Sequence, residues 1–189
     1  DGRHITFTAR GGDIFPGVEI GDSQAYVRDV DGGTTKLVSA NTDGVPGNSN
    51  SRAGGVSNGG QAVVFESFAN NLIADDTEGQ SDIFWRDMSS GDVRRLSAND
   101  GVGGNGSSLN PVISADGRYV GFVNYSTNLL PSADHEQANI FLFDLQSSTL
   151  EPLSPSRDGG SPTGSSFLPS LSLDASVVIY LTSATDIVP

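Results

Sequence analysis

The sequence predicts an all-β protein made of β-propeller blades, each with four antiparallel strands. A turn, an apolar strand, a polar loop and a second apolar strand return every 57 or 58 residues along the 189-residue chain. The 24 Gly residues, together with Asn, Asp and Ser, separate the apolar runs and supply the backbone angles that turns require. No stretch carries the apolar spacing of an amphipathic helix. Tandem units of four short strands are typical of propellers.

The first strand of each copy follows a small turn and carries an aromatic ring at the same place. These rings are Phe7, Phe65, Phe122 and Tyr180, spaced 58, 57 and 58 residues apart. The spacing divides a single propeller region, 1–189, into blade-like repeats at about 1–58, 59–115 and 116–173 and a partial repeat at 174–189. We therefore expect about three and a quarter blades.

The second strand of each complete copy closes on an aspartate, at Asp29, Asp87 and Asp144. A catalytic acid normally occurs once, whereas a residue present in every blade has a repeated structural task. We expect these carboxylates to accept hydrogen bonds from the backbone of the hairpin that follows.

A third, weaker strand ends at Ser39, Ser97 and Ser154. A Gly-, Asn- and Ser-rich connection then leads to a fourth short strand, clearest at 111–114 and 169–172, where the first copy has Gly54-Gly55 instead of Pro-Val or Pro-Ser. The first strands are apolar on both faces, which favours sheets stacked blade against blade.

Segments of these copies resemble a known family. S-A-D-G-R-Y-V-G-F at 114–122, D-I-F-W-R-D at 82–87 and N-I-F-L-F-D at 139–144 are similar to the bacterial WD40-like propeller repeat of TolB-type proteins. The resemblance covers essentially the whole chain. It implies a scaffold or interaction platform and gives no catalytic residue.

The number of blades raises the question of how the ring closes. Propellers have about four to eight blades, so three units and one further strand leave sheet edges open for pairing with another chain. We expect a ring that continues in further sequence, completion by identical chains, or an open stacked assembly.

Composition excludes several partners. The net charge of −13 and the absence of a basic patch argue against nucleic acid and against an anionic membrane surface. With no Cys, the chain has no disulfide or thiolate metal site. No apolar run approaches a membrane span, and no signal peptide is visible. Because the chain begins inside a repeat, we expect a processed piece of an exported, extracytoplasmic protein.

An acidic loop offers a candidate metal site. Asp75, Asp76, Glu78 and Asp82 place four carboxylates within eight residues, and oxygen ligands of this kind suit Ca²⁺. The spacing is not that of an EF-hand, so a solvated acidic loop is the alternative. His4 and His135 do not form a zinc pair at any recognisable spacing.

No pattern in the sequence is a specific catalytic signature, so the sequence favours a non-enzymatic extracytoplasmic propeller scaffold that mediates protein interaction or self-assembly. The alternative is a propeller hydrolase or a carbohydrate-binding module with its site in the channel or in missing blades. Glu66 and Tyr125 are the polar residues near first strands that break the repeat. Trp85 and Phe84 are neighbours in one strand and must face opposite ways. One of them could stack on a sugar, although burial between blades is the simpler role.

Overall fold

The computed structural model describes residues 2–10, 14–15, 17–18, 21–74, 76, 79–99, 101–129, 137–157, 159–160 and 162–187. This part of the chain is all-β, with one short 3-10 turn, η1 (Asn58–Gly60), and no α-helix. The first strands are β1 (His4–Arg10), β2 (Ser23–Asp29), β3 (Thr34–Leu37), β4 (Ser51–Val56), β5 (Ala62–Ser67), β6 (Asp82–Asp87) and β7 (Val93–Arg95). The remaining strands are β8 (Ala98–Asn99), β9 (Val102–Gly103), β10 (Ser108–Ile113), β11 (Tyr119–Asn124), β12 (Asn139–Asp144), β13 (Thr149–Pro152), β14 (Ser166–Leu171) and β15 (Val178–Thr182).

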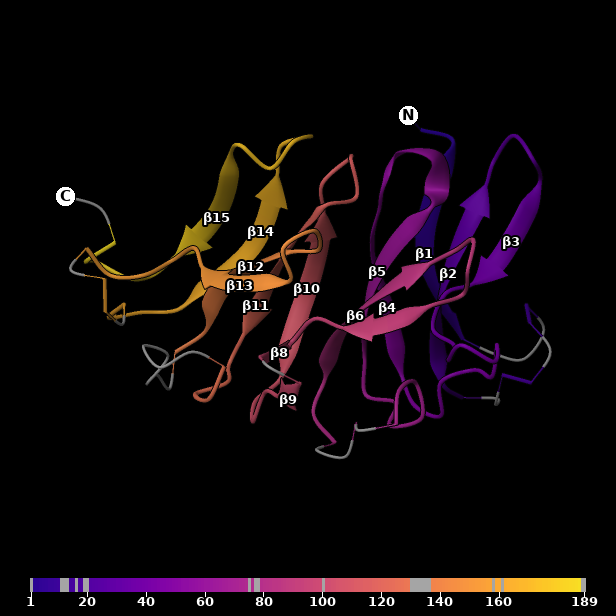
Figure 1. Cartoon of the computed structure of the whole chain (residues 1–189), viewed down its shortest axis with the longest axis horizontal. Helices are drawn as coiled ribbons and strands as arrows, with labels where there is room; N and C mark the ends of the chain where they lie inside the picture. The colour runs from indigo at the N-terminus through magenta and orange to yellow at the C-terminus, as the bar shows by residue number, and fades with distance from the viewer. Residues whose placement is uncertain are drawn as a thin grey trace.

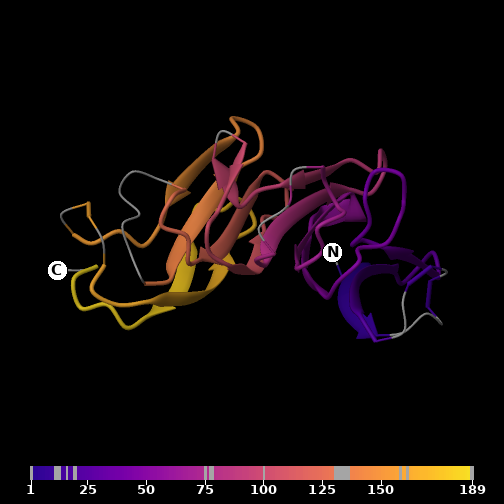
Figure 2. The same cartoon turned by 90° about the horizontal axis from the view of Figure 1, so that it is seen from below.

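Four antiparallel sheets stand side by side in chain order, with the first and the last at opposite ends of an open row (Figures 1 and 2). Their strand orders are β1-β2-β3, β4-β5-β6-β7, β10-β11-β12-β13 and β14-β15. In the described part of the chain these four sheets contain thirteen strands, which is three and a quarter times four. The propeller fold and the partial blade count are thus confirmed, whereas the hairpin β8-β9 in the connection at 98–103 was not predicted.

The sheets and the sequence repeats are out of phase by one strand. The fourth strand of each sequence repeat pairs with the first strand of the next repeat, as β4 does with β5 and β10 with β11. We call β4, β10 and β14 the leading strands of their sheets. The connections before them cross from one sheet to the next. Within the described residues, the two middle sheets therefore contain four strands, the first sheet three and the last sheet two.

The repeated rings occupy equivalent surroundings. Phe65 stacks on Phe84 with ring centroids 5.4 Å apart, and Phe122 stacks on Phe141 at 6.2 Å. In the first sheet Tyr26 takes the place of the second ring, and it stacks on Phe7 at 5.4 Å. Each pair joins the first two strands of its repeat. The two later pairs also pack against the preceding sheet, as Phe65 does against Ala25, Val27 and Val38. The core therefore lies between the sheets, as predicted from their two apolar faces.

The repeated serines lie just beyond the third strands and are fully buried. Each hydroxyl accepts a hydrogen bond from a backbone N–H at the start of the second strand: Ser39 from Ala25 at 2.9 Å, Ser97 from Ile83 at 3.0 Å and Ser154 from Ile140 at 2.9 Å. Because a buried N–H without an acceptor is destabilising, each sheet needs this hydroxyl at the same place.

The Gly-Gly exception in β4 has a steric cause. A Cβ atom on Gly54 would lie 2.6 Å from the carbonyl oxygen of Pro111 and 2.9 Å from that of Val64. The next leading strand thus approaches β4 too closely for any side chain at this position.

Candidate functional site

The predicted calcium ligands are only partly within the described chain. Asp75 and Glu78 lie outside the described residues. Asp76 and Asp82 are described, and their side chains are 4% and 1% exposed. Each has a carboxylate oxygen 3.6 Å from Nη1 of Arg95, whose side chain is itself buried. A calcium ion at these two residues would share their carboxylates with a guanidinium, and the calcium site stays a prediction.

Two further contacts fix this buried cluster. The hydroxyl of Ser97 donates a hydrogen bond to Oδ1 of Asp82. On the other side, a Cβ on Gly103 would lie 2.8 Å from both terminal nitrogens of Arg95, so the missing side chain makes room for the guanidinium. Across the described part of the chain, no three His, Cys, Asp or Glu side chains gather as a metal site.

Sequence reasoning missed Arg95 because it considered the acidic residues alone. At the equivalent places the first repeat has Gln24 and Leu37, and the third has Asn139 and Pro152. Asp82 and Arg95 therefore break the repeat together. That joint departure is the signal from which the pair could have been found.

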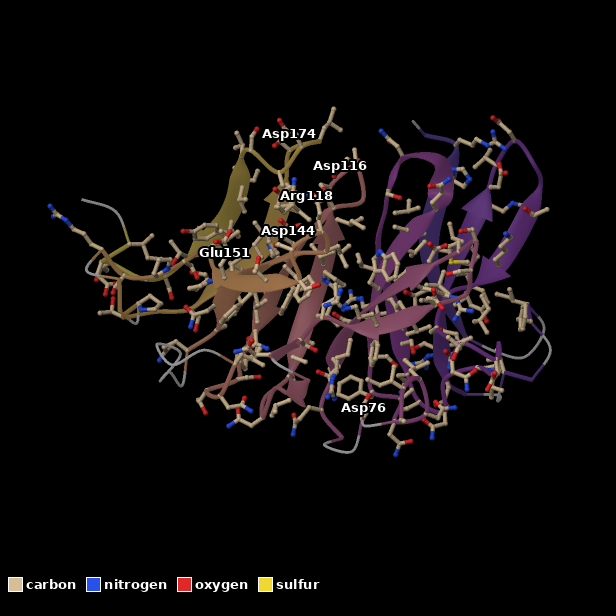
Figure 3. The ribbon with its side chains drawn as sticks, in the orientation of Figure 1. Asp76, Asp116, Arg118, Asp144, Glu151 and Asp174 are labelled. Carbon is tan, nitrogen blue, oxygen red and sulfur yellow. The ribbon has the colours of Figure 1, made fainter. Side chains whose placement is uncertain are left out.

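The aspartates that close the second strands organise hairpins, as predicted. Oδ1 of Asp29 accepts from the Gly32 N–H at 2.9 Å, Asp87 from Ser89 at 2.7 Å and Asp144 from Gln146 at 2.9 Å. Arg3 holds the pKa of Asp29 well below its usual range, mainly through a hydrogen bond between the side chains. Arg118 does the same for the pKa of Asp144. Figure 3 shows Arg118 and Asp144 near each other, at a distance from Asp76.

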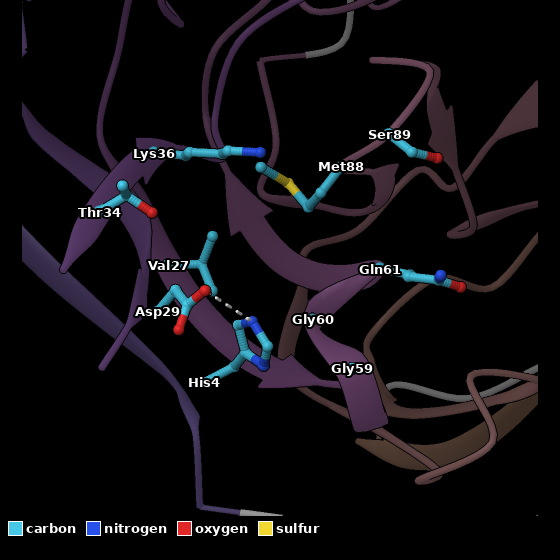
Figure 4. A pocket seen from close by; sticks show the side chains of 10 residues that line it. All are labelled: His4, Val27, Asp29, Thr34, Lys36, Gly59, Gly60, Gln61, Met88 and Ser89. Carbon is cyan, nitrogen blue, oxygen red and sulfur yellow. Dashed lines mark ion pairs between the residues drawn. The ribbon is translucent and has the colours of Figure 1, made fainter. Parts of the chain in front are cut away.

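His4 lies in a cleft of about 220 Å³ between the first two sheets (Figure 4). Its Nε2 atom is 3.9 Å from Oδ2 of Asp29, and Gly60 packs so closely on the ring that a Cβ there would clash with it. Lys36, Gln61 and Met88 also line the cleft. His4 is thus held between a turn aspartate and a glycine, where it packs between the first two sheets. His135 lies outside the described residues.

The charged pair Arg52–Glu66 is the strongest candidate for a function that only one blade carries. The two residues are register partners on β4 and β5, with Nη1 of Arg52 3.9 Å from Oε1 of Glu66. The equivalent partners are Leu109 and Val123 in the next sheet. Arg52 is 70% exposed, whereas Glu66 is buried. The pair therefore presents a cation to solvent above a buried carboxylate.

Two clefts meet at this pair. One, of about 390 Å³, is lined by Arg52 and Glu66 with Thr8 and Phe68. The other, of about 270 Å³, is lined by the same pair with Asn110 and Leu168. A guanidinium and a carboxylate beside an apolar ring can bind a small polar ligand.

Glu66 also has a structural task. Its Oε2 atom accepts a hydrogen bond from the backbone N–H of Asn110 on the next leading strand, at 2.7 Å. One sheet earlier, the hydroxyl of Thr8 accepts from the N–H of Ala53 at 2.9 Å. Thr8 and Glu66 occupy the same place in the repeat, and each joins its sheet to the following one. Glu66 thus needs no catalytic role to explain its burial.

The remaining candidates are accounted for by packing and exposure. Phe84 packs in the core cluster of the first two sheets, whereas Trp85 packs in the next cluster, so the two face opposite ways as predicted. Tyr125 is exposed at the end of β11. Phe84, Trp85 and Tyr125 do not line either of the two clefts beside the Arg52–Glu66 pair.

Comparison with known proteins identifies the fold. Neither a protein-family model nor a curated protein matches the chain. A structure assigned as TolB from Agrobacterium tumefaciens aligns with a TM-score of 0.61 and 22% identity over 100% of this chain and 53% of its own. TolB from Acinetobacter baumannii aligns with a TM-score of 0.53 and 20% identity over 96% of this chain and 41% of its own. The tricorn protease aligns with a TM-score of 0.55 and 12% identity over 95% of this chain and 14% of its own.

These likenesses show that the chain has the β-propeller fold of TolB structures, which confirms the resemblance seen in the sequence at the level of the fold. The chain spans about half the length of the Agrobacterium protein. Among the described residues, no helix has the length and the apolarity needed to cross a membrane.

Proposed function

We propose that this TolB-like propeller chain is a non-enzymatic extracytoplasmic scaffold that binds protein partners or copies of itself through the open ends of its row of sheets. The observation that supports this function most strongly is the state of the last sheet. Among the described residues, β15 pairs with β14 alone, whereas β5 and β11 each have a strand on both sides. Its Ile179 and Leu181 side chains are 65% and 64% exposed.

The corresponding surfaces of the earlier sheets are covered. Val64, which is equivalent to Ile179, is fully buried in a cluster with Val120 and Phe122 of the following sheet. In the third sheet Gly121 takes this position, and a Cβ on it would meet the side chain of Leu171 on β14 at 3.5 Å. Adjacent exposed apolar side chains of this kind mark an interaction surface.

The charge and the family resemblance support the rest of the proposal. A net charge of −13 keeps a scaffold soluble and disfavours phosphate-rich partners. The extracytoplasmic location rests on the resemblance of the repeats to TolB-type proteins.

Light scattering coupled to size-exclusion chromatography tests the proposal. The chain has a mass of 19.6 kDa, and self-association predicts a larger, concentration-dependent mass. A monodisperse 19.6 kDa monomer at every concentration contradicts self-association, and failure to bind any protein as well would contradict the scaffold role.

The Arg52–Glu66 pair favours a second candidate function, that of a propeller hydrolase or carbohydrate-binding module. It supplies a charged site that the repeat does not explain. A screen against glycosides and peptides would test this alternative. Activity that Glu66→Gln abolishes would favour it over the scaffold.

A further inference from the structure

The Arg52–Glu66 pair stands at a place where the later sheets have apolar partners. The register partners at this place are Leu109 with Val123 in the third sheet and Phe167 with Leu181 in the last. An ion pair in which one side chain is mostly exposed contributes little to stability, because water screens the attraction. The fold therefore does not require charges at this place, and a ligand can account for them.

The two charged groups are open to a third partner. Oε2 of Glu66 accepts the hydrogen bond from the Asn110 N–H, whereas Oε1 faces Nη1 of Arg52 at 3.9 Å. A hydrogen bond between nitrogen and oxygen spans about 2.7–3.2 Å, so these two atoms do not form one with each other. Oε1 can therefore accept a hydrogen bond from a ligand's cation, and the exposed guanidinium can donate two to a ligand's carboxylate.

Opposite charges side by side select a zwitterion. A purely anionic ligand meets the carboxylate of Glu66 and the net charge of −13, and a purely cationic one meets the guanidinium of Arg52. An α-amino acid carries its ammonium and its carboxylate on one carbon atom, so it can face both groups at once. An extended tripeptide separates these charges by up to about 10 Å, since each residue adds about 3.3–3.6 Å.

The cleft of about 270 Å³ beside the pair offers apolar walls for the ligand's side chain. The leading strands β4, β10 and β14 form it together with Glu66 of β5. Its apolar lining consists of Ala53, Pro111, Val112, Leu168 and Pro169. The cleft of about 390 Å³ also has an apolar ring, that of Phe68, but it adds the second guanidinium of Arg10. An apolar side chain therefore fits the smaller cleft better.

Leu168 holds an unusual backbone conformation on the wall of the smaller cleft. Its φ is +53°, and that of Asn110, the equivalent residue in the preceding repeat, is +55°. Asparagine adopts this left-handed conformation readily, whereas a bulky side chain rarely does. Residues held in such conformations cluster at ligand sites. The chain thus keeps an apolar side chain in the cleft at a place where the backbone favours asparagine.

We propose that the smaller cleft binds a free α-amino acid with an apolar side chain. The carboxylate of the amino acid pairs with Arg52, its ammonium donates to Oε1 of Glu66, and its side chain packs against Leu168. This site uses the pair that favours the second candidate function, but it binds without a chemical step. Amino-acid binding does not depend on the scaffold function, which light scattering tests separately.

Isothermal titration calorimetry with L-leucine and L-phenylalanine tests the proposal. Two leucine analogues probe the charges, because 3-methylbutylamine lacks the carboxylate and 4-methylpentanoate lacks the ammonium. Each should bind about tenfold or more weakly than L-leucine, the loss expected for a hydrogen bond to a charged group. Trileucine should also bind more weakly, because its charged termini lie apart. Absence of binding by both amino acids at millimolar concentration, or an analogue that binds as tightly as L-leucine, overturns the proposal.

Two variants that copy equivalent residues remove the contacts and should still fold. Arg52→Leu copies Leu109 and should weaken L-leucine binding about tenfold or more. Leu168→Asn copies Asn110 and suits the positive φ, so it should weaken binding of L-leucine but not of glycine. Full affinity for L-leucine in either variant contradicts the proposal.

The matched control is Phe68→Ser, which changes the larger cleft alone. It should leave the affinity for L-leucine unchanged. Weaker binding in this variant, with none lost in Leu168→Asn, would place the ligand in the other cleft and overturn the assignment. Hydrolysis of a glycoside or peptide without amino-acid binding overturns this site while leaving the second candidate function in place.

Discussion

The guanidinium of Arg118 donates two hydrogen bonds to the carboxylate of Asp144, from Nε to Oδ1 at 3.0 Å and from Nη2 to Oδ2 at 2.6 Å. Arg3 and Asp29 repeat this geometry at 3.0 and 2.8 Å. The middle repeat has Gln61 in place of the arginine, and the Ser89 hydroxyl donates to its aspartate instead. The aspartate is constant while its partner varies, so its common task is to shape the hairpin.

Acid is expected to destabilise the propeller between about pH 4 and pH 2. Hydrogen bonds from Ser176 and Ser172 lower the pKa of Asp174 to about 2, and the arginines lower the pKa values of Asp29 and Asp144. An unfolded aspartate titrates near 3.9, so the stabilisation is complete above that pH and is lost as the pH falls through the folded pKa. Circular dichroism should show a melting temperature that falls steeply below about pH 4.

The control for this acid effect is Asp144→Asn, which cannot titrate. Its melting temperature should change less than that of the wild type between pH 5 and pH 2, as estimated from the linkage of proton binding to folding. Equal acid sensitivity of the two proteins would contradict the assignment.

Ser97→Ala should lower the free energy of unfolding by about 1–3 kcal/mol, because it leaves the buried N–H of Ile83 without its acceptor. Ser39→Ala and Ser154→Ala remove the equivalent contact in the flanking sheets. The Ser39 and Ser154 hydroxyls donate to side-chain amide oxygens, whereas the Ser97 hydroxyl donates to the carboxylate of Asp82. We therefore expect the largest loss at Ser97, measured by urea denaturation. Ser170→Ala at an exposed position of β14 is the control and should stay within about 0.5 kcal/mol of the wild type; a comparable loss there would refute the ranking.

Arg95→Met should destabilise the chain by about 3–5 kcal/mol, because it leaves two buried carboxylates without their cation. Adding Asp76→Asn and Asp82→Asn to this variant removes both negative charges and should recover part of the loss. Urea denaturation of the single and triple variants measures the difference. A triple variant less stable than Arg95→Met would show that the charges do not interact in this way.

Calcium binding at Asp75, Asp76, Glu78 and Asp82 would raise the melting temperature on adding CaCl₂ and lower it on adding a chelator, since a ligand of the folded state alone stabilises that state. Asp75→Asn with Glu78→Gln is the informative variant because it spares the two carboxylates that contact Arg95. If calcium binds, this variant should lose the response. A wild-type melting temperature that neither treatment moves would reject the calcium site.

The repeat could be recognised in the sequence because the aromatic rings and the turns recur with the same period. Phe65 and Phe122 are 57 residues apart and stack on Phe84 and Phe141 in matching sheets. The role of Asp87 was predictable for the same reason: a carboxylate before a hairpin has local N–H groups as partners.

Sheet membership was harder to predict because a periodic sequence can be divided at any point. Periodicity alone does not show that β4 pairs forward with β5 rather than backward with β3. Contacts between non-equivalent positions were equally hidden. The pairing of Asp82 with Arg95 depends on two departures from the repeat. The sequence does not show that these two residues interact, because their contact depends on β6 and β7 being neighbours in the sheet.

Two substitutions of Glu66 distinguish a structural role of this residue from a catalytic one. Glu66→Gln keeps an oxygen that can accept the hydrogen bond from the Asn110 N–H, so the scaffold should change little in stability. Glu66→Val copies the residue at the equivalent position, Val123, and removes that acceptor, which should cost about 1–3 kcal/mol. Denaturation of both variants measures this contrast. The structural role requires the valine variant to be clearly the weaker one, because only it leaves the N–H unsatisfied; if the two variants lose equal stability, the negative charge beside Arg52 is what matters, and the ligand-binding alternative gains support.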